Sequence, residues 1–327
     1  MKLQILVPQY NEPDFIVKRL LDSIAIQQSV NLNDIGVIIC NDGSDTYLGN
    51  ELINAYPFDI EYHLEPHRGV SGTRNACLDY AKADYVMFCD ADDMFFNVCG
   101  LYLIINEIDN GGFDSLTSIF VEEIKILGTD KYAYIQHPND STFVHGKVHR
   151  RKYLIDNNIK WNECLTIHED SYFNCLCRAL SNNVKYCPNA FYLWKWRDNS
   201  VCRRDPKYIL KTYKNLLDSN NALIKQFIDR GLETEAMFYV GNMVYEAYYT
   251  MNKDEWLSQE NQDYRIQTER KFRGCYLMHK ELFNKIPEDM RKRIIVSLRG
   301  RKFEEGMMFE SITFNDWIKH IENDLKE

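Results

Sequence analysis

The chain has 327 residues, of which 45% are hydrophobic and 13% aromatic, enough for one sizeable core and a second, appended one. Its formal net charge of −9 argues against a general polyanion binder, and no apolar stretch approaches the roughly 20 residues that a membrane span needs. The ten cysteines are scattered through apolar segments without a Cys-x-x-Cys pair, which favours buried free thiols over zinc ligation, redox chemistry or disulfides. Because the N-terminus runs directly into a strand pattern without the order of a secretory signal, we expect a cytoplasmic protein.

The first hundred residues alternate short apolar runs with helical patterns. The apolar runs predict strands over residues 3–8, 35–40, 60–64 and 85–89. The segments between them predict helices over residues 13–28, 46–55 and 70–81. Strands that alternate with helices in this way predict an α/β domain whose central sheet is mostly parallel and doubly wound.

After residue 100 this alternation loosens, and the last third of the chain has helical patterns only. Strands are expected over residues 115–127 and 131–136, and helices over residues 101–110, 170–180, 237–251 and 313–325. A further helix is expected to begin at Asp205-Pro206, a cap and a first-turn proline, and to end at Gly231. The chain is therefore predicted to comprise an α/β domain, residues 1–204, and a helical domain, residues 205–327.

The helical third contains a run of basic residues that no acid interrupts. Its members are Arg291, Lys292, Arg293, Arg299, Arg301 and Lys302. A solvated helix face or loop is the favoured interpretation, and contact of residues 291–302 with an anionic acceptor or a membrane surface is the alternative.

Polar segments follow three of the predicted strands. They are residues 8–12 (PQYNE), 41–45 (NDGSD) and 90–93 (DADD). Because the carboxyl ends of parallel strands meet at one edge of a sheet, these segments are expected to form one surface.

The acidic segment Asp90-Ala91-Asp92-Asp93 places three carboxylates within four residues, and they repel one another unless a cation lies among them. In an extended segment Asp90 and Asp92 point the same way, so together they can bind one Mg²⁺ or Mn²⁺ that also holds a diphosphate. The alternative is a solvated turn in which an aspartate caps a helix.

The second polar segment and the start of the helix after residue 68 offer ligand-binding groups. Asp42 can accept a hydrogen bond from a uracil imide or a ribose hydroxyl, although Asn-Asp-Gly-Ser is also an ordinary turn. The helix that follows Arg68-Gly69 can hold an anion through its free N–H groups, with Arg68 or Arg74 adding charge. Equally, Arg74 can brace the acidic segment by an ion pair.

Two acids, Glu169 and Asp170, begin the predicted helix at residue 170. Acids favour this position even in inert proteins, because they interact well with the helix dipole. Near a sugar-binding cleft, however, one of them can act as the general base that takes a proton from an acceptor hydroxyl.

Six motifs in this order resemble the family 2 inverting glycosyltransferases of the GT-A fold, over about the first 200 residues. They are residues 7–11, 41–45, 68–76, 90–93, 168–173 and 192–201. The resemblance implies transfer from a nucleotide-diphosphate sugar, UDP-linked in the preferred hypothesis, with Mn²⁺ or Mg²⁺ and inversion of the anomeric configuration.

The resemblance also implies roles for individual residues. Asp90, with Ala91 beside it, would contact ribose or metal-bound water, and Asp92 would bind the metal. Asp170 would be the catalytic base, with Glu169 next to it. The nucleoside pocket would be bordered by Pro8, Tyr10, Asn11 and Asp42. A segment that closes over the donor diphosphate or the acceptor would contain Trp194, Trp196 and Arg197.

Several alternatives stay open at this level. Candidates for a third metal ligand are His145, His149 and His168. Aromatic residues near 161 and 192–196 suit stacking on sugars or burial in a core. The acceptor class can be a glycan, a lipid-linked oligosaccharide, a protein or a modified nucleic acid. A nucleotidyltransferase and an inactive nucleotide-sugar-binding scaffold are the rival functions.

Overall fold

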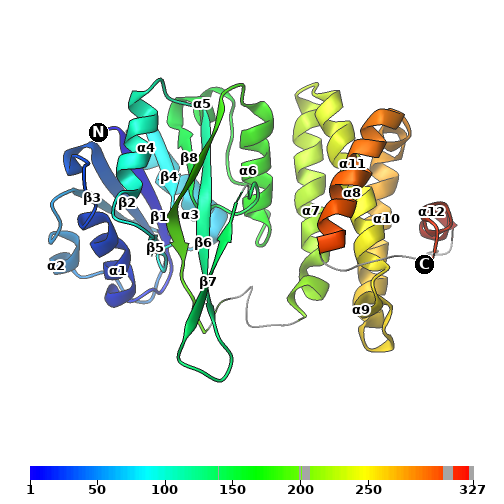
Figure 1. Cartoon of the computed structure of the whole chain (residues 1–327), viewed down its shortest axis with the longest axis horizontal. Helices are drawn as coiled ribbons and strands as arrows, with labels where there is room; N and C mark the ends of the chain where they lie inside the picture. The colour runs from blue at the N-terminus through cyan, green and yellow to red at the C-terminus, as the bar shows by residue number, and fades with distance from the viewer. Residues whose placement is uncertain (139, 199, 201–206, 305–311, 324–327) are drawn as a thin grey trace. The chain divides into compact units, whose positions relative to one another are not determined.

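The computed structural model describes residues 1–138, 140–198, 200, 207–304 and 312–323. Contacts divide the chain into two units, Met1–Ser200 and Val201–Glu327, and each unit has its own hydrophobic core (Figure 1). The helix start predicted at Asp205-Pro206, and with it the predicted domain boundary, lies outside the described residues.

The first unit contains one nine-stranded mixed sheet, in the order β3-β2-β1-β4-β8-β6-β9-β5 with β7 paired to β6. Its strands are β1 (Leu3–Gln9), β2 (Ile35–Asp42), β3 (Asp59–Glu65), β4 (Tyr85–Phe88), β5 (Met94–Phe95), β6 (Ser115–Lys125), β7 (Tyr132–His137), β8 (Lys147–Arg150) and β9 (Val184–Trp194). The first four strands are parallel, as predicted, whereas β8 pairs antiparallel with both β4 and β6.

Helices cover both faces of this sheet (Figure 1). They are α1 (Asp14–Ala25), α2 (Asn50–Ile53), α3 (Gly69–Tyr80), α4 (Gly100–Asp109), α5 (Arg151–Asp156) and α6 (Glu169–Leu180). Because side chains alternate along a strand, Ile5 in β1 joins the core beneath α1 and α4. On the other face, Phe88 in β4 packs edge-on against Phe173 in α6.

The helix predicted over residues 46–55 is mostly wrong, because only Asn50–Ile53 is helical. Two backbone N–H groups before it are bonded to side chains from other elements. Leu48 donates to the Tyr62 hydroxyl at 3.2 Å, and Gly49 donates to the Asp14 carboxylate at 3.3 Å. Tertiary contacts thus hold this segment in a loop where local pattern alone favoured a helix.

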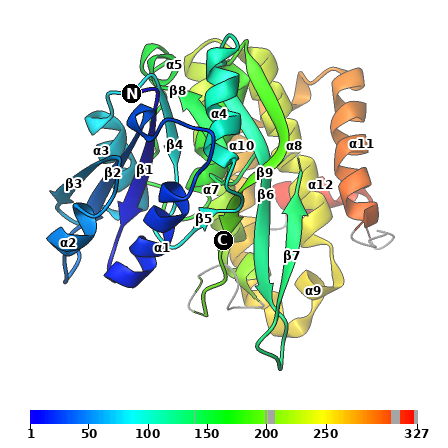
Figure 2. The same ribbon diagram turned by 60° about the vertical axis from the view of Figure 1, so that its left-hand side comes forward.

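The second unit is helical throughout its described part (Figure 2). Its helices are α7 (Tyr208–Asp229), α8 (Glu233–Met251), α9 (Asp254–Leu257), α10 (Gln262–Asn284), α11 (Glu288–Glu304) and α12 (Phe314–Asn323). Gly231 follows α7 with a φ of 71°, a left-handed conformation that suits the predicted C-terminal glycine. None of the helices in the described ranges has the length and apolar character that crossing a membrane requires.

The basic run at residues 291–302 lies on α11, where three of its side chains make intramolecular contacts, among them Lys292 with Glu288 at 3.6 Å. Arg291 donates to the carbonyl oxygen of Phe283 at 2.7 Å, near the end of α10. Arg293 pairs with Asp289 one turn earlier in α11, at 3.1 Å. These contacts support the helix ends, and binding of an anionic surface by this run stays a prediction.

Candidate active site

The loops that follow β1 and β2 bind each other, so two of the three polar segments predicted to share one surface do so. The Asn11 N–H donates to Ser44 Oγ at 2.8 Å, and the Asp45 N–H donates to Asn11 Oδ1 at 2.9 Å. Asn11 has a φ of 62°, and asparagine is one of the few residues that adopt this left-handed conformation readily. The two loops therefore form a single rim at this edge of the sheet.

Asp42 lies at the end of β2 and binds the backbone at the start of α3. Its two carboxylate oxygens accept from the N–H groups of Arg68 at 2.7 Å and Gly69 at 3.0 Å. The His67 Nδ1 is 3.0 Å from the same carboxylate. Gly43 beside it has a φ of 68°. A Cβ at this position would lie 2.8 Å from the backbone nitrogen of His67. In this structure Asp42 thus holds the loop before α3, and its predicted contact with a nucleoside stays a prediction.

An exposed aromatic pair lies beside Asp42. The rings of Tyr10 and His67 are 4.7 Å apart between centroids, and 49% of Tyr10 is exposed. Pro8 is half-buried next to this pair, and the Arg68 side chain is exposed. An exposed ring face at the carboxyl ends of the strands is suited to stacking against a flat nucleotide base.

The most connected side chain in the site is Arg74, which lies in α3 and is 3% exposed. Its guanidinium contacts three carboxylates from two other elements. Nη2 donates to Asp90 Oδ1 at 3.0 Å, in the loop after β4. Nη1 donates to Glu169 Oε1 at 3.1 Å and to Asp170 Oδ1 at 2.6 Å, at the start of α6. Of the two predicted roles for Arg74, these ion pairs favour bracing of the acidic segment.

The Arg74 guanidinium also lies over the ring of Trp161, 4.4 Å from its centroid. Trp161 in turn stacks on Phe173 with centroids 4.1 Å apart and an angle of 3°. Trp161 is 2% exposed and Tyr192 is fully buried. These two aromatic residues therefore belong to the core, and they offer no surface for stacking on a sugar.

Burial and crowding of like charges shift the pKa values of the carboxylates around Arg74. Burial, together with the neighbouring charge of Asp170, raises the pKa of Glu169 to about 7, although Arg74 opposes this. Burial likewise raises the pKa of Asp170. Burial also opposes ionisation of Asp90, but the positive charge of Arg74 holds its pKa below the ordinary value. Asp90 is thus the charged partner, while the pair on α6 is poised to bind a proton.

The start of α6 is fixed by its backbone contacts. His168, immediately before the helix, has a φ of 64°, which is uncommon for a residue other than glycine and is found often at functional sites. Asp170 Oδ2 accepts from the Val144 N–H at 3.0 Å. Both Asp170 oxygens therefore have a fixed donor, which orients the carboxylate.

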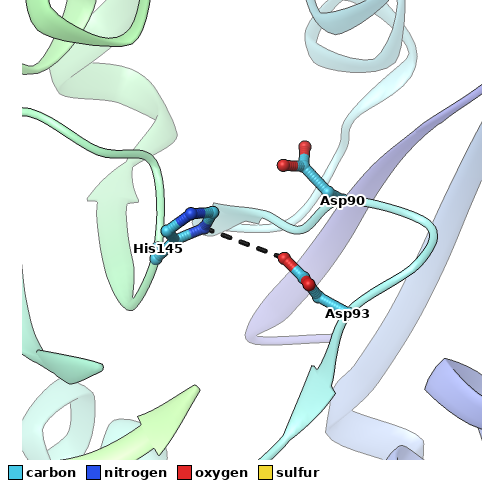
Figure 3. Close-up of side chains that lie close together, drawn as sticks. All are labelled: Asp90, Asp93 and His145. Atoms are coloured by element: carbon cyan, nitrogen blue, oxygen red, sulfur yellow. Dashed lines mark ion pairs between the residues drawn. The ribbon is translucent and has the colours of Figure 1, made fainter. Parts of the chain in front are cut away.

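A second group of polar side chains lies next to Asp90, with ligand-type atoms all within 4.8 Å of one another: Asp90, Asp93 and His145 (Figure 3). His145 is 3% exposed, and its Nδ1 makes no hydrogen bond within the described part of the chain. This nitrogen lies 3.8 Å from Asp93 Oδ2. Burial lowers the pKa of His145 to about 3, so the imidazole is neutral and can serve as a metal ligand.

Asp93 itself is fully engaged by protein groups. It accepts from the Tyr192 hydroxyl at 2.5 Å and from the Lys195 N–H at 2.9 Å. Burial and the charges of Asp92 and Asp90 raise its pKa well above the ordinary value. Asp93 therefore ties the acidic loop to the end of β9.

Asp92, the predicted metal ligand, is paired with an arginine from the segment after β9. Its Oδ2 accepts from Arg197 Nη1 at 2.7 Å, and the same nitrogen is 3.3 Å from Glu12 Oε1 in the loop after β1. The Trp196 N–H donates to Glu123 Oε1 at 3.3 Å. The structure thus brings the segment at residues 194–198 to the acidic loop, and its closing over a donor or an acceptor stays a prediction. Asn199 and residue 201 of that motif lie outside the described residues.

Sequence reasoning missed the roles of Asp93 and Tyr192, and it named Arg197 without predicting its ion pair with Asp92. In the sequence Asp93 is only the third acid of Asp90-Ala91-Asp92-Asp93. Nothing in the sequence shows that the fold buries it. His145 was one of three candidate histidines, and the structure places it beside Asp90.

Comparisons with known proteins show the family and the fold. A family model described as Glycosyl transferase family 2 matches residues 4–168. The uncharacterized glycosyltransferase EpsJ of Bacillus subtilis is 23% identical over 223 residues, which are 61% of this chain and 62% of EpsJ. The poly(ribitol-phosphate) beta-N-acetylglucosaminyltransferase TarS of Staphylococcus aureus is 25% identical over 207 residues, which are 59% of this chain and 35% of TarS. The chain thus spans less than two thirds of the length of these relatives.

Solved structures show the same fold. The crystal structure of S. aureus TarS residues 1–349 in complex with UDP-GlcNAc has a TM-score of 0.65 at 18% identity. It covers 95% of this chain and 93% of that chain. The complex of the same TarS fragment with UDP has a TM-score of 0.64 at 16% identity. The GT-A-like fold predicted for the first unit, followed by a helical region, is thereby confirmed.

The raised pKa of Glu169 predicts that the stability of the fold depends on pH. Because its pKa rises from 4.5 to about 7 on folding, the folded chain binds more protons than the unfolded chain between these values, and stability falls as pH rises through that window. We expect Glu169→Gln to raise the melting temperature at pH 8 by roughly 4–8 °C, since about 2 kcal/mol of charge crowding is removed. At pH 5, where Glu169 is already neutral, the variant and the wild type should melt together.

Thermal unfolding of both proteins at pH 5 and pH 8 measures this difference. Glu51→Gln, at an exposed position on α2, is the matched control and should have no pH-dependent effect. Equal melting temperatures of Glu169→Gln and wild type at pH 8 would contradict the crowding described around Arg74.

Proposed function

The chain belongs to glycosyl transferase family 2, and we propose that it transfers a sugar from UDP to an acceptor hydroxyl with inversion at the anomeric carbon. The observation that carries this proposal is the bridge made by Arg74, which holds Asp90 on one side and the acid pair Glu169 and Asp170 on the other. The proposed donor-side carboxylate and the candidate bases would thus lie around one buried guanidinium, that of Arg74. The choice of UDP is supported by the complexes of TarS with UDP and UDP-GlcNAc.

Asp170 is the proposed general base. Burial raises its pKa and so increases its basicity, and the Val144 N–H and Arg74 fix its orientation. Asp170 takes the proton from the acceptor hydroxyl while that oxygen forms a bond to the anomeric carbon. The bond from this carbon to the diphosphate oxygen breaks on the opposite face, and UDP leaves. Glu169, next to Asp170, stores or shares the proton.

The rim formed by the loops after β1 and β2 is the proposed nucleoside pocket. The exposed Tyr10 ring, which is tilted by 31° against His67, provides a face for the base. Asn11 and Asp42 border this face, and Pro8 lies half-buried beside them. Arg197 and Trp196, at the other side of the acidic loop, are proposed to close over the diphosphate. Arg197 is 41% exposed on its side chain, so it can exchange its contact with Asp92 for one with a phosphate.

The acidic loop fits a divalent cation. Carboxylates are the ligands that Mg²⁺ and Mn²⁺ prefer, and the buried imidazole of His145 has a nitrogen without a hydrogen bond to any described residue. We assign Asp90 and Asp92 to the cation, with His145 as the nearby neutral donor. When bound, Mn²⁺ or Mg²⁺ would offset the negative charge that grows on the departing diphosphate.

The first test of the proposal is the variant Asp170→Asn, which keeps the shape of the side chain and removes its basicity. We expect the rate of UDP release from UDP-sugars in the presence of acceptor to fall by about 10²–10⁴-fold, the usual contribution of a general base. The affinity for UDP, measured by calorimetry, should stay within a factor of about two, since Asp170 does not contact the proposed nucleoside pocket. Normal turnover by this variant would remove Asp170 from the role, and release of pyrophosphate in place of UDP would indicate a nucleotidyltransferase.

Metal binding is tested separately with Asp92→Asn. We expect its affinity for UDP in the presence of Mn²⁺ to fall by at least about tenfold, because a carboxylate ligand is lost. Without Mn²⁺, the variant and the wild type should bind UDP equally. Asp59→Asn, an exposed position at the start of β3 and so at the opposite end of the strands, is the control and should behave as wild type. An unchanged Mn²⁺-dependent affinity in Asp92→Asn would reject the assignment of Asp92.

A further inference from the structure

Strand β7 presents two exposed tyrosines on one side. Along one of its edges β7 pairs with β6 (Figure 1). Because side chains alternate along a strand, Tyr132 and Tyr134 point to the same face, about 7 Å apart along the chain. They are 41% and 56% exposed, in contrast to the buried Trp161 and Tyr192. His137, on the opposite side of β7, stacks on Phe120 of the core at 4.6 Å.

Two charged side chains lie among these tyrosines. Lys195 Nζ is 5.9 Å from the centre of the Tyr132 ring and 2.6 Å from Glu123 Oε2. The Tyr134 hydroxyl donates to the same Glu123 oxygen at 3.0 Å. We give the name tyrosine ledge to the side chains of Tyr132, Tyr134 and Lys195 together with the buried Glu123 carboxylate that joins them. The charges around these tyrosines are paired, Lys195 with Glu123 and Lys125, opposite Tyr132 in β6, with Asp198 at 3.7 Å, so the ledge attracts neither strong anions nor strong cations.

The tyrosine ledge is continuous with the reaction site through the segment that follows β9. The Lys195 N–H donates to Asp93 in the acidic loop, at 2.9 Å. The Trp196 N–H donates to Glu123 on the ledge, and the next residue, Arg197, pairs with Asp92. One short stretch of chain therefore contacts both the ledge and the loop assigned to the donor diphosphate.

The chemistry of the tyrosine ledge matches an uncharged glycan. Tyrosine combines a rigid apolar ring with a hydroxyl, so it can cover the C–H face of a sugar and hydrogen-bond to the hydroxyls at its rim. Glu123 is 2% exposed and its oxygens accept from Lys195, Tyr134 and Trp196, so the polar groups that a glycan can reach are the Lys195 ammonium and the tyrosine hydroxyls. Two rings in line along a strand suit a chain of linked sugars better than a single sugar.

Resting on the proposed function, we propose that the acceptor is an extended, uncharged glycan whose units beyond the accepting sugar bind Tyr132 and Tyr134. The accepting hydroxyl would then lie at Asp170, and the rest of the glycan would follow residues 194–197 to the tyrosine ledge. Tyr132 and Tyr134 are binding residues in this proposal, and they take no part in the bond changes at the anomeric carbon.

The test compares Tyr132→Ala/Tyr134→Ala with the wild type on acceptors of two lengths. The probes are uncharged hexasaccharides, namely cellohexaose, maltohexaose and chitohexaose, and the methyl glycosides of their single sugars. We expect the KM for the hexasaccharide that is used, and its Kd by calorimetry, to rise about tenfold or more. The KM for the single sugar, the KM for the UDP-sugar and its slow hydrolysis without acceptor should not change. Tyr102→Ala, a similarly exposed tyrosine on α4, is the matched control.

Each outcome separates the two proposals. A hexasaccharide Kd and KM that are the same in the double variant and the wild type would overturn the glycan site and leave the edge of β7 to another occupant, such as a protein strand. Failure of the wild type to bind any of the three hexasaccharides would overturn it as well. Absence of UDP release from every UDP-sugar, despite hexasaccharide binding at the ledge, would instead contradict the proposed transferase function. Tyr132→Phe/Tyr134→Phe should retain most of the affinity, because the ring faces remain.

Discussion

The buried guanidinium of Arg74 lies within hydrogen-bonding distance of Asp90, Glu169 and Asp170. One buried positive charge thus faces three partly buried carboxylates, an arrangement that costs free energy unless a proton or a further cation joins it. The pKa of Glu169, raised to about 7, is the direct consequence. The remaining features of the site depend on this interaction, because it fixes α3, the acidic loop and the start of α6 relative to one another.

Around this bridge, the other contacts divide into two kinds. Some hold the frame, as where Asp42 binds the backbone before α3 and Asp93 binds Tyr192. Others are exposed and exchangeable, as where Arg197 pairs with Asp92. A transferase needs both, since the acids must be held in place while donor and acceptor enter and leave. The excess negative charge of these acids lowers the stability of the fold. Binding of a cation together with a diphosphate is the function for which the acids would be retained.

Much of this was accessible from the sequence. The alternation of apolar runs predicted the first four strands, and the rule that strand ends converge placed the loops of Asn11 and Asp45 together. Arg74 was recognised as a candidate brace for the acids because it follows a glycine-rich helix start. What the sequence could not predict depends on burial and on pairing across the sheet: the antiparallel strand β8, the engagement of Asp93, and the exposure of Tyr132 where Trp161 is buried. Local sequence patterns do not predict these features, because each depends on contacts between residues far apart in the chain.

The central claim is that the acids around Arg74 surround the reacting carbon of a sugar nucleotide. A crystal structure of the chain with Mn²⁺ and an intact UDP-sugar tests it most directly. The account predicts the cation at Asp90, the base of the nucleotide beside Tyr10, and the sugar between the diphosphate and Asp170. A donor bound elsewhere, with Asp90, Glu169 and Asp170 unchanged and distant from it, would contradict the account.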